Sequence, residues 1–366
     1  MNDHKIKVLV ADDSALMRMF LVHLLESDPR IEVVATVDDG QAALDFVTRS
    51  KPDVVLMDIH MPGMDGFEAT RRIMETQPVP IVICSGTART QDVVITFQAM
   101  EAGAIACIQK PLARNQRDFE AMAAHLLETV KLMSEVKVVR RRARPPLAPL
   151  SASHPVPAAT WQNAPVRIKL IGIGASTGGP PVLQTILAGL PKDFAVPVLI
   201  VQHIAKGFVS GMAEWLIQTT SLQIHIASYG TTPLPGHVYL APDDFHMGIG
   251  GGGTIILTRE PPENHLRPAV AYLFRTLAQA VGPNAVGVLL TGMGRDGADE
   301  LKAMRDRGAV TIAQDLESSV VHGMPGVAIA LGGATHVLPA TKIADALVAL
   351  VKGNGQDGQD GLSRMR

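Results

Sequence analysis

The first third of the chain alternates short apolar runs with amphipathic segments of helical period. This pattern extends from Lys5 to about Leu132, and each apolar run is followed by turn residues. The runs predict five strands, at Ile6–Ala11, Ile31–Thr36, Val54–Met57, Pro80–Cys84 and Ile105–Ile108. Strands that alternate with helices in this way are typical of a parallel sheet wrapped by helices.

The same alternation returns from Arg167 to about Lys352. It predicts further strands at Ile168–Ile173, Pro197–Gln202, Val286–Leu290 and Ala309–Ala313. At about 150 residues per domain, the 366 residues hold two such α/β domains with some linker between them. We place the first domain at residues 1–125 and the second at residues 167–352.

The residues between and after the two domains differ from them in composition. Residues 126–166 contain an arginine-rich run, Arg140–Arg144, followed by six prolines, and we interpret them as a linker. The basic run is an alternative contact for nucleic acid, but no helix-turn-helix or zinc module accompanies it, so we favour a solvated linker. Residues 353–366 are glycine-rich and polar and predict a frayed tail.

Charge, hydrophobicity and cysteine content narrow the possible environments. Thirty-three basic and 35 acidic residues give a net charge of -2, which offers no general attraction for nucleic acid or an acidic membrane. Apolar residues make up 47% of the chain, yet no stretch of about 18 uncharged apolar residues occurs, so we predict no membrane insertion. Cys84 and Cys107 lie in apolar runs without a secretory leader, which predicts reduced thiols and a cytoplasmic protein.

Polar residues end several strands of the first domain, where the carboxyl edge of a parallel sheet brings them together. They are Asp12, Asp13, Asp58, Ser85 and Lys110. Carboxylates placed this close repel one another and suit a hard cation such as Mg²⁺, and one of them, Asp58, can attack phosphorus. Helix capping is the alternative explanation for isolated aspartates, but their joint placement argues against it.

Three segments carry a resemblance to the response-regulator receiver domain: Val10-Ala11-Asp12-Asp13-Ser14, Leu56-Met57-Asp58-Ile59-His60-Met61-Pro62-Gly63-Met64-Asp65-Gly66 and Gln109-Lys110-Pro111. The resemblance implies that Asp58 accepts a phosphoryl group from a histidine kinase. It also implies that Asp13, Asp58 and the carbonyl of His60 hold Mg²⁺, that Asp12 acts partly through water, and that Ser85 bonds the phosphoryl group. Cys107 stands where many receivers carry an aromatic switch residue.

A second set of reactive residues lies in the second domain. Ser176 follows a predicted strand on a glycine-rich turn before a helix, His203 ends the next strand, and Asp296 follows a later one. Ser176 suits a nucleophile, His203 a general base that then acts as an acid, and Asp296 a carboxylate that orients the histidine. Each has a structural alternative, and the neighbouring glycines invite a dinucleotide-binding interpretation. Thr177 stands where that fingerprint needs glycine, which argues against it.

The segments Gly174-Ala175-Ser176-Thr177-Gly178-Gly179-Pro180, Gln202-His203 and Thr291-Gly292-Met293-Gly294-Arg295-Asp296-Gly297-Ala298 resemble the chemotaxis protein-glutamate methylesterase family. The resemblance implies two doubly wound parallel-sheet domains, a flavodoxin-like receiver followed by a Rossmann-like catalytic domain. It implies hydrolysis of glutamate methyl esters, and deamidation of glutamines, on methyl-accepting chemoreceptors. The Met293 N–H would bind the oxyanion with support from Thr177, and the catalytic domain would need no cofactor.

Three positions depart from that family's usual residues: Ile204-Ala205, Asp243-Asp244-Phe245 and Ala271. We expect them at the rims of the cleft, where they affect receptor choice more than chemistry. The domain order suggests that the unphosphorylated receiver covers the cleft. The alternatives are a non-enzymatic regulator whose second domain only binds a partner, and a dinucleotide oxidoreductase. Labelling by a serine-directed organophosphonate separates the enzyme from the regulator.

Overall fold

The computed structural model describes residues 5–86, 90–111, 116–136, 138 and 167–352. The chain divides into two compact units, residues 1–149 and 150–366. The described residues therefore fall into two bodies that match the two stretches of alternating pattern. The expected tail and most of the expected linker lie outside the described residues.

The first unit contains a five-stranded parallel sheet. Its strand order is β2-β1-β3-β4-β5, with bounds β1 Ile6–Ala11, β2 Ile31–Val37, β3 Val54–Met57, β4 Ile81–Ser85 and β5 Ala106–Gln109. This order is that of flavodoxin-like folds, in which ligands bind at the carboxyl ends of the strands. All five predicted strands are confirmed, each within one residue at either end.

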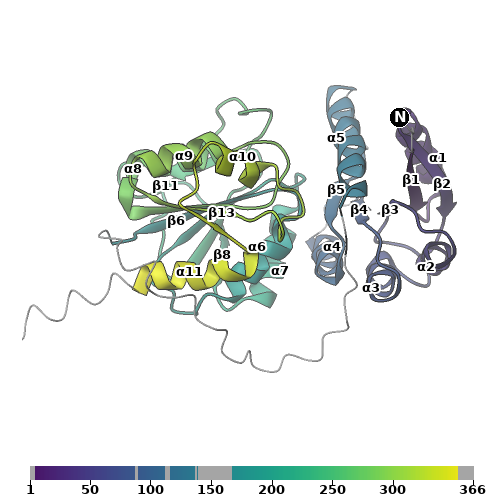
Figure 1. Cartoon of the computed structure of the whole chain (residues 1–366), viewed down its shortest axis with the longest axis horizontal. Helices are drawn as coiled ribbons and strands as arrows, with labels where there is room; N and C mark the ends of the chain where they lie inside the picture. Colours follow the sequence, from purple (N-terminus) through teal and green to yellow (C-terminus); the bar gives the residue numbers. More distant parts are fainter. Residues whose placement is uncertain (1–4, 87–89, 112–115, 137, 139–166, 353–366) are drawn as a thin grey trace, which may run out of the picture. The chain divides into compact units, whose positions relative to one another are not determined.

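Helices cover both faces of this sheet, α1 and α5 on one side and α2, α3 and α4 on the other (Figure 1). Their bounds are α1 Ala15–Glu26, α2 Gly40–Arg49, α3 Gly66–Thr76, α4 Thr90–Ala102 and α5 Gln116–Ser134. The expected boundary at residue 125 is wrong, because α5 continues nine residues beyond it. Leu126, Val130 and Met133 recur at helical spacing and are fully buried, so this segment belongs to the core of the first unit.

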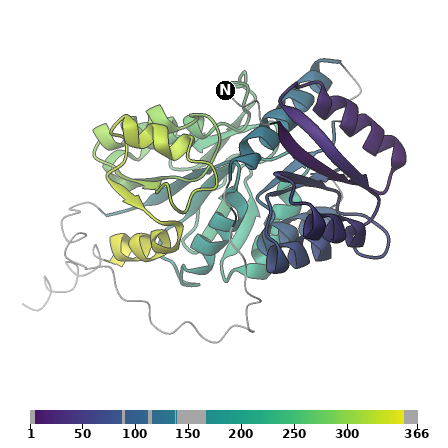
Figure 2. The same cartoon turned by 45° about the vertical axis from the view of Figure 1, so that its right-hand side comes forward.

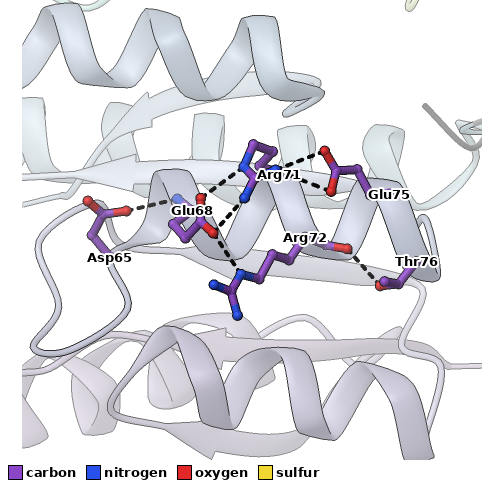
Figure 3. Close-up of polar contacts among 6 residues, drawn as sticks. All are labelled: Asp65, Glu68, Arg71, Arg72, Glu75 and Thr76. Carbon is purple, nitrogen blue, oxygen red and sulfur yellow. Dashed lines mark hydrogen bonds and ion pairs between the residues drawn. The ribbon is translucent and has the colours of Figure 1, made fainter. Parts of the chain in front are cut away.

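Helix α3 is the most polar helix of the first unit and is stabilised along its surface (Figure 3). The Asp65 side chain caps its start by accepting the Glu68 N–H. Arg71 then binds Glu68 on one side and Glu75 on the other, while Arg72 also binds Glu68. These spacings of three and four residues place the charges on neighbouring turns. The first residue of the helix, Gly66, donates its N–H to the Ile59 carbonyl at 2.9 Å, which joins the helix start to the turn that follows Asp58.

The second unit is built on a seven-stranded parallel sheet of order β14-β13-β12-β6-β7-β9-β8. The strand bounds are β6 Leu170–Ala175, β7 Val198–Gln202, β8 Gln223–Ile226, β9 His237–Leu240, β12 Ala285–Leu289, β13 Val310–Gln314 and β14 His336–Leu338. A separate antiparallel hairpin joins β10 His246–Ile249 to β11 Ile255–Thr258. The four strands predicted from apolar runs are confirmed as β6, β7, β12 and β13.

Two layers of helices sandwich this sheet, with α8, α9 and α10 on one face and α6, α7 and α11 on the other (Figures 1 and 2). Their bounds are α6 Gly179–Ala188, α7 Val209–Thr219, α8 Val270–Ala280, α9 Ala298–Asp306, α10 Met324–Ala330 and α11 Ala340–Lys352, and a short 3-10 helix spans Gly282–Asn284. On the α8 side of the sheet, Leu273, Phe274 and Leu277 are fully buried in the core. Both units thus have the two-sided layering predicted from the sequence.

The direction of chain progression reverses at β6. The chain first moves from β6 to β7 and onward to one edge, and it later returns to place β12 on the other side of β6. Loops that leave β6 and β12 therefore diverge, and ligands of α/β proteins bind at such a switch point at the carboxyl edge of the sheet. Ser176 and Asp296 follow these two strands. Within the described ranges, no helix has the length and hydrophobicity that a membrane crossing requires.

Candidate functional sites

Asp58 lies at the carboxyl edge of the first sheet, directly after β3. Its Oδ1 accepts the Ile59 N–H at 2.8 Å, and its Oδ2 lies 2.8 Å from Nζ of Lys110. The same ammonium group lies 2.6 Å from Oδ2 of Asp12. Asp12, Asp58 and Lys110 are all buried. The strand ends thus bring the predicted residues together as one buried cluster of two carboxylates and a cation.

The charges in this cluster shift one another's protonation. Burial raises the pKa of Asp58, and the hydrogen bond from Lys110 opposes that rise. Burial alone would lower the pKa of Lys110, but its hydrogen bonds to Asp12 and Asp58 outweigh burial and raise the pKa. Lys110 therefore stays cationic and supplies the positive charge that a phosphoryl group on Asp58 would need.

The acidic side chains at this edge fit a hard divalent cation. Asp12, Asp13 and Asp58 each offer an oxygen atom, and these atoms lie within 4.8 Å of one another. Asp13 is exposed, so a cation held there would keep a side open to solvent. Three converging carboxylate oxygens are the donor set that Mg²⁺ prefers. His60 follows two residues after Asp58 in the same turn, at the position expected to give its carbonyl.

Two further residues of the first unit lie where the sequence predicts them. Ser85 ends β4 and is buried, and its carbonyl accepts the Lys110 N–H at 2.9 Å. Ser85 and Lys110 are thus neighbours at the same edge of the sheet. Cys107 lies on β5 opposite Ile83. Neither cysteine is bonded to the other, and burial raises the pKa of Cys107 to about 12.

In the second unit, Ser176 begins the turn that joins β6 to α6. Its N–H donates to the Thr291 carbonyl at 3.0 Å, and its own carbonyl accepts from Gly179. Gly178 has a φ of +77°, a left-handed conformation that glycine adopts without strain. Pro180 lies in the first turn of α6, where a proline sacrifices no hydrogen bond. The turn holds a half-buried serine at the carboxyl edge of the central strand.

His203 lies beside this turn because its strand pairs with β6. Its N–H donates to the Ala175 carbonyl at 2.9 Å. The carboxamide of Gln202 donates to the carbonyls of both Ser176 and His203, each at 2.8 Å. Gln202 is buried, so one side chain ties the predicted nucleophile to the predicted base. Sequence reasoning did not assign Gln202 this role, although it precedes His203 directly.

Asp296 completes the predicted set. Its Oδ2 lies 2.9 Å from Nε2 of His203, as an ion-pair contact rather than an aligned hydrogen bond. The same carboxylate accepts two backbone hydrogen bonds at the start of α8, from Val270 at 2.6 Å and from Ala271 at 3.1 Å. Each carboxylate oxygen thus accepts one backbone donor, which fixes the direction of the side chain. The structure therefore brings His203 and Asp296 into contact and places Ser176 on the neighbouring strand end.

Thr291 organises the loop that carries Met293. Its hydroxyl donates to the Thr177 carbonyl at 2.9 Å and accepts the Val321 N–H at 3.0 Å, while Gln314 accepts its N–H at 2.8 Å. Thr291 and Gln314 are fully buried. Gly292 lies so near Ser176 that an added Cβ would meet the serine Cβ at 2.7 Å. Met293 follows Gly292 directly in the chain.

The three departures from the family pattern are not all at the rim. Ala271 is 4% exposed, and its N–H binds Asp296, so the expectation of a rim position is wrong there. Any residue type except proline supplies a backbone N–H, so the hydrogen bond to Asp296 does not depend on the side chain at this position. Asp243 accepts the Gly207 N–H at 2.7 Å, and Asp244 pairs with Lys206. Both contacts anchor the loop that follows His203.

Comparisons with known proteins assign each of the two units to a family. Residues 171–347 match the CheB methylesterase family model, and residues 8–119 match the response regulator receiver domain model. A protein-glutamate methylesterase/protein-glutamine glutaminase of Nitrosospira multiformis is 53% identical over 352 residues, which cover 96% of this chain and 98% of that protein. One of Geobacter metallireducens, with the same name and the number 4, is 54% identical over 94% of this chain and 99% of its own length.

A solved structure, the Thermotoga maritima CheB methylesterase catalytic domain, is 40% identical, with a TM-score of 0.49, and covers 51% of this chain and all of its own. The family models and the relatives define the class: a hydrolase domain joined to a response-regulator receiver. The chain belongs to the protein-glutamate methylesterase/protein-glutamine glutaminase family.

Proposed function

We propose that this protein hydrolyses methyl esters of glutamate side chains, and deamidates glutamine side chains, on methyl-accepting chemoreceptors. Ser176, His203 and Asp296 carry the reaction. The observation that supports this most directly is the 2.9 Å contact of His203 with Asp296 beside the turn that holds Ser176. The names of the relatives that match nearly the whole chain support the choice of substrate.

The reaction begins with attack of the Ser176 hydroxyl on the side-chain carbonyl of the substrate. Nε2 of His203 faces Asp296, so Nδ1 is the ring nitrogen left to take the hydroxyl proton. We find no side-chain hydrogen bond between Ser176 and His203 in the described part of the chain; in serine hydrolases this bond often tightens only with substrate. Asp296 stabilises the imidazolium ion that results.

The tetrahedral intermediate then collapses. His203 returns the proton to the leaving group, so the carbon–oxygen bond to methoxide breaks and methanol leaves; from glutamine, ammonia leaves instead. Water next attacks the acyl-enzyme with His203 as base, which yields the free carboxylate and restores Ser176. No described residue accepts a hydrogen bond from the Met293 N–H, which supports it as the oxyanion donor. Thr177 supports the same turn through its carbonyl bond to Thr291. None of these steps needs a cofactor.

The receiver supplies the control. A histidine kinase or a small acyl phosphate donates a phosphoryl group to Asp58, whose carboxylate attacks phosphorus and releases the donor's leaving group. Asp12, Asp13, Asp58 and the His60 carbonyl would hold Mg²⁺ there. The ion would neutralise charge on the phosphoryl oxygens, as Lys110 does, and Ser85 would bond one of them. Phosphorylation then shifts the receiver between two conformations, and this shift regulates the rate of hydrolysis.

The test measures methanol released from membranes that carry methylated receptors. Wild type is compared with Ser176→Ala and Asp58→Asn, each with and without acetyl phosphate. We expect release to stop in Ser176→Ala, and Asp58→Asn to keep only the rate of the wild type without donor. Covalent labelling by a fluorophosphonate should require Ser176. A wild type that neither labels nor releases methanol would contradict the esterase and favour a non-enzymatic regulator.

A further inference from the structure

His246 is a fully buried histidine that the proposed reaction does not use. It is the first residue of β10, and its side chain is 0% exposed. Its ring contacts two segments at once, the stretch after β11 and the start of α8. A polar ring is costly to bury unless its nitrogen atoms are paired, so the partners of both nitrogens define what the ring does.

The partners of the ring fix its protonation state. Nδ1 lies 3.2 Å from the Ala269 backbone nitrogen, which can only donate a hydrogen bond, so Nδ1 is an acceptor. Nε2 lies 3.2 Å from the Pro261 carbonyl, which can only accept, so Nε2 carries the proton. The ring is therefore neutral, and each nitrogen has one defined role. A second proton, on Nδ1, would oppose the Ala269 N–H.

Neighbouring side chains hold the plane of this ring. The Tyr272 ring stacks on it with centroids 5.0 Å apart and an interplanar angle of 19°. Arg275 lies over Tyr272 at 5.5 Å and also binds Glu263, in the stretch that precedes α8. The imidazole is thus held against α8 by stacking and by the stretch after β11, and its hydrogen bond to Ala269 has a fixed direction.

Ala269 is the residue immediately before the two that bind Asp296. The backbone N–H groups of three consecutive residues all point to side chains: Ala269 to His246, then Val270 and Ala271 to Asp296. Ala269 has no side chain that could cap α8. Side chains from other segments therefore hold the start of α8: the imidazole of His246 binds Ala269, and the carboxylate of Asp296 binds the next two residues.

We propose that His246 is a positioning residue, which acts through the start of α8 to orient Asp296 toward His203. This inference rests on the proposed function, because it concerns the same reaction. Nδ1 is the atom that carries this effect, because it accepts the Ala269 N–H and so fixes the backbone whose next two N–H groups bind Asp296. The proton on Nε2 only ties down the preceding stretch.

A pair of substitutions separates the two nitrogens. In His246→Asn, the amide oxygen can take the place of Nδ1 and accept the Ala269 N–H, while the contact with Pro261 is lost. In His246→Gln, the longer side chain places its amide near the former Nε2 and leaves Ala269 without its acceptor. Both variants remove the ring and its stacking on Tyr272, so they are matched in what else they lose.

The readout is kcat and KM for methanol release from receptor membranes by the full chain. We expect His246→Asn to keep kcat within about threefold of wild type, and His246→Gln to lose about 10- to 100-fold in kcat, with KM changed less than about threefold. Thr276→Val is the control. It removes a hydrogen bond between α8 and β10, from the Ile249 N–H, away from Asp296, and should lower the melting temperature without lowering kcat.

Two results would overturn the inference. One is that Asn and Gln have equal kcat values, whether unchanged or reduced. The other is a decrease in kcat that correlates with the decrease in melting temperature across all three variants. The wild type itself gives a further test, because ¹⁵N NMR of its slowly exchanging histidine must show a neutral ring with the proton on Nε2; an imidazolium, or a proton on Nδ1, contradicts the proposal even where a variant fails to fold. If wild-type protein releases no methanol, the proposed function fails instead.

Discussion

Two buried aspartates, Asp58 and Asp296, follow strands at the carboxyl edges of the two sheets, yet their surroundings differ. Asp58 shares an ammonium group with a second buried carboxylate, and burial raises its pKa. Asp296 instead accepts two backbone N–H groups at the start of a helix and contacts an imidazole. The same side chain is therefore set up for two roles, one as a nucleophile and one as a fixed negative charge.

The partners explain the difference in physical terms. An ammonium group on a flexible chain can follow a carboxylate as it gains a phosphoryl group, so Lys110 suits a residue that reacts. Backbone donors at a helix start cannot move without moving the helix, so they suit a residue that must keep its charge and direction. Substitutions at the two aspartates should consequently fail in different ways.

Asp296→Asn should have the largest effect on hydrolysis. The amide cannot stabilise an imidazolium, and its NH₂ group would oppose the N–H groups of Val270 or Ala271. We expect kcat for methanol release to fall about 10⁴-fold. Phosphorylation of Asp58 by acetyl phosphate, measured on the same preparation, should be unchanged. A variant that keeps more than about a tenth of the wild-type rate would show that Asp296 does not orient His203.

Two glycine substitutions, one beside each site, are expected to have smaller effects than Asp296→Asn. An added Cβ at Gly66 would lie 1.9 Å from the Asp58 carbonyl oxygen, whereas one at Gly292 would lie 2.7 Å from the Ser176 Cβ. Backbone cannot give way as a side chain can, so Gly66→Ala should cost about 3 kcal/mol in unfolding free energy, measured by urea denaturation. At Gly292 the added Cβ would also lie 2.3 Å from the Met324 sulfur, so Gly292→Ala should displace both Met324 and Ser176 and lower kcat about 100-fold.

The control for both is Gly251→Ala, where an added Cβ meets no atom within 4 Å. It should change neither the urea midpoint nor the rate of methanol release. Loss of hydrolysis in Gly66→Ala without loss of stability would contradict the separation of the two sites, as would a Gly292→Ala variant with full activity.

The sequence predicts most of the framework because the long parallel strands are continuous apolar runs bounded by turns. The short strands β8, β9 and β14, and the β10–β11 hairpin, were not predicted; β8 and β14 are only partly buried, and short runs carry little periodicity. The boundary of the first domain was placed too early, at residue 125, although Leu126, Val130 and Met133 continue the helical spacing of α5. There, a change in composition was given more weight than periodicity.

The candidate sites likewise contain residues that the sequence could predict and residues that it could not. Side chains at strand ends, such as Asp58 and Ser176, were predictable because topology brings strand ends together. The donors to Asp296 were not, because a backbone N–H leaves no mark on residue type. His246 was not singled out either, since a histidine in an apolar strand is usually structural and only its two hydrogen bonds distinguish it.

The smallest expected effect is on stability, from surface ion pairs, which form a network in the first unit and an isolated pair in the second. Arg71 and Arg72 bind Glu68 and lower its pKa from 4.5 to about 2. A lowered pKa means that the ionised form stabilises the folded state. This stabilisation is complete above pH 4.5 and is lost as pH falls toward 2. Glu68→Gln should therefore cost about 0.5 kcal/mol at pH 7 and nothing near pH 2, by urea denaturation.

Asp299→Asn in the second unit gives the matched comparison. Its single pair with Arg295 is more than half exposed on both sides, whereas Glu68 is 29% exposed and binds two arginines. Solvent screens an isolated exposed pair, so we expect less than about 0.3 kcal/mol at either pH. In 1 M NaCl the difference between the two variants should shrink. Equal costs for both variants at pH 7 would mean that the α3 network contributes no more than one isolated pair.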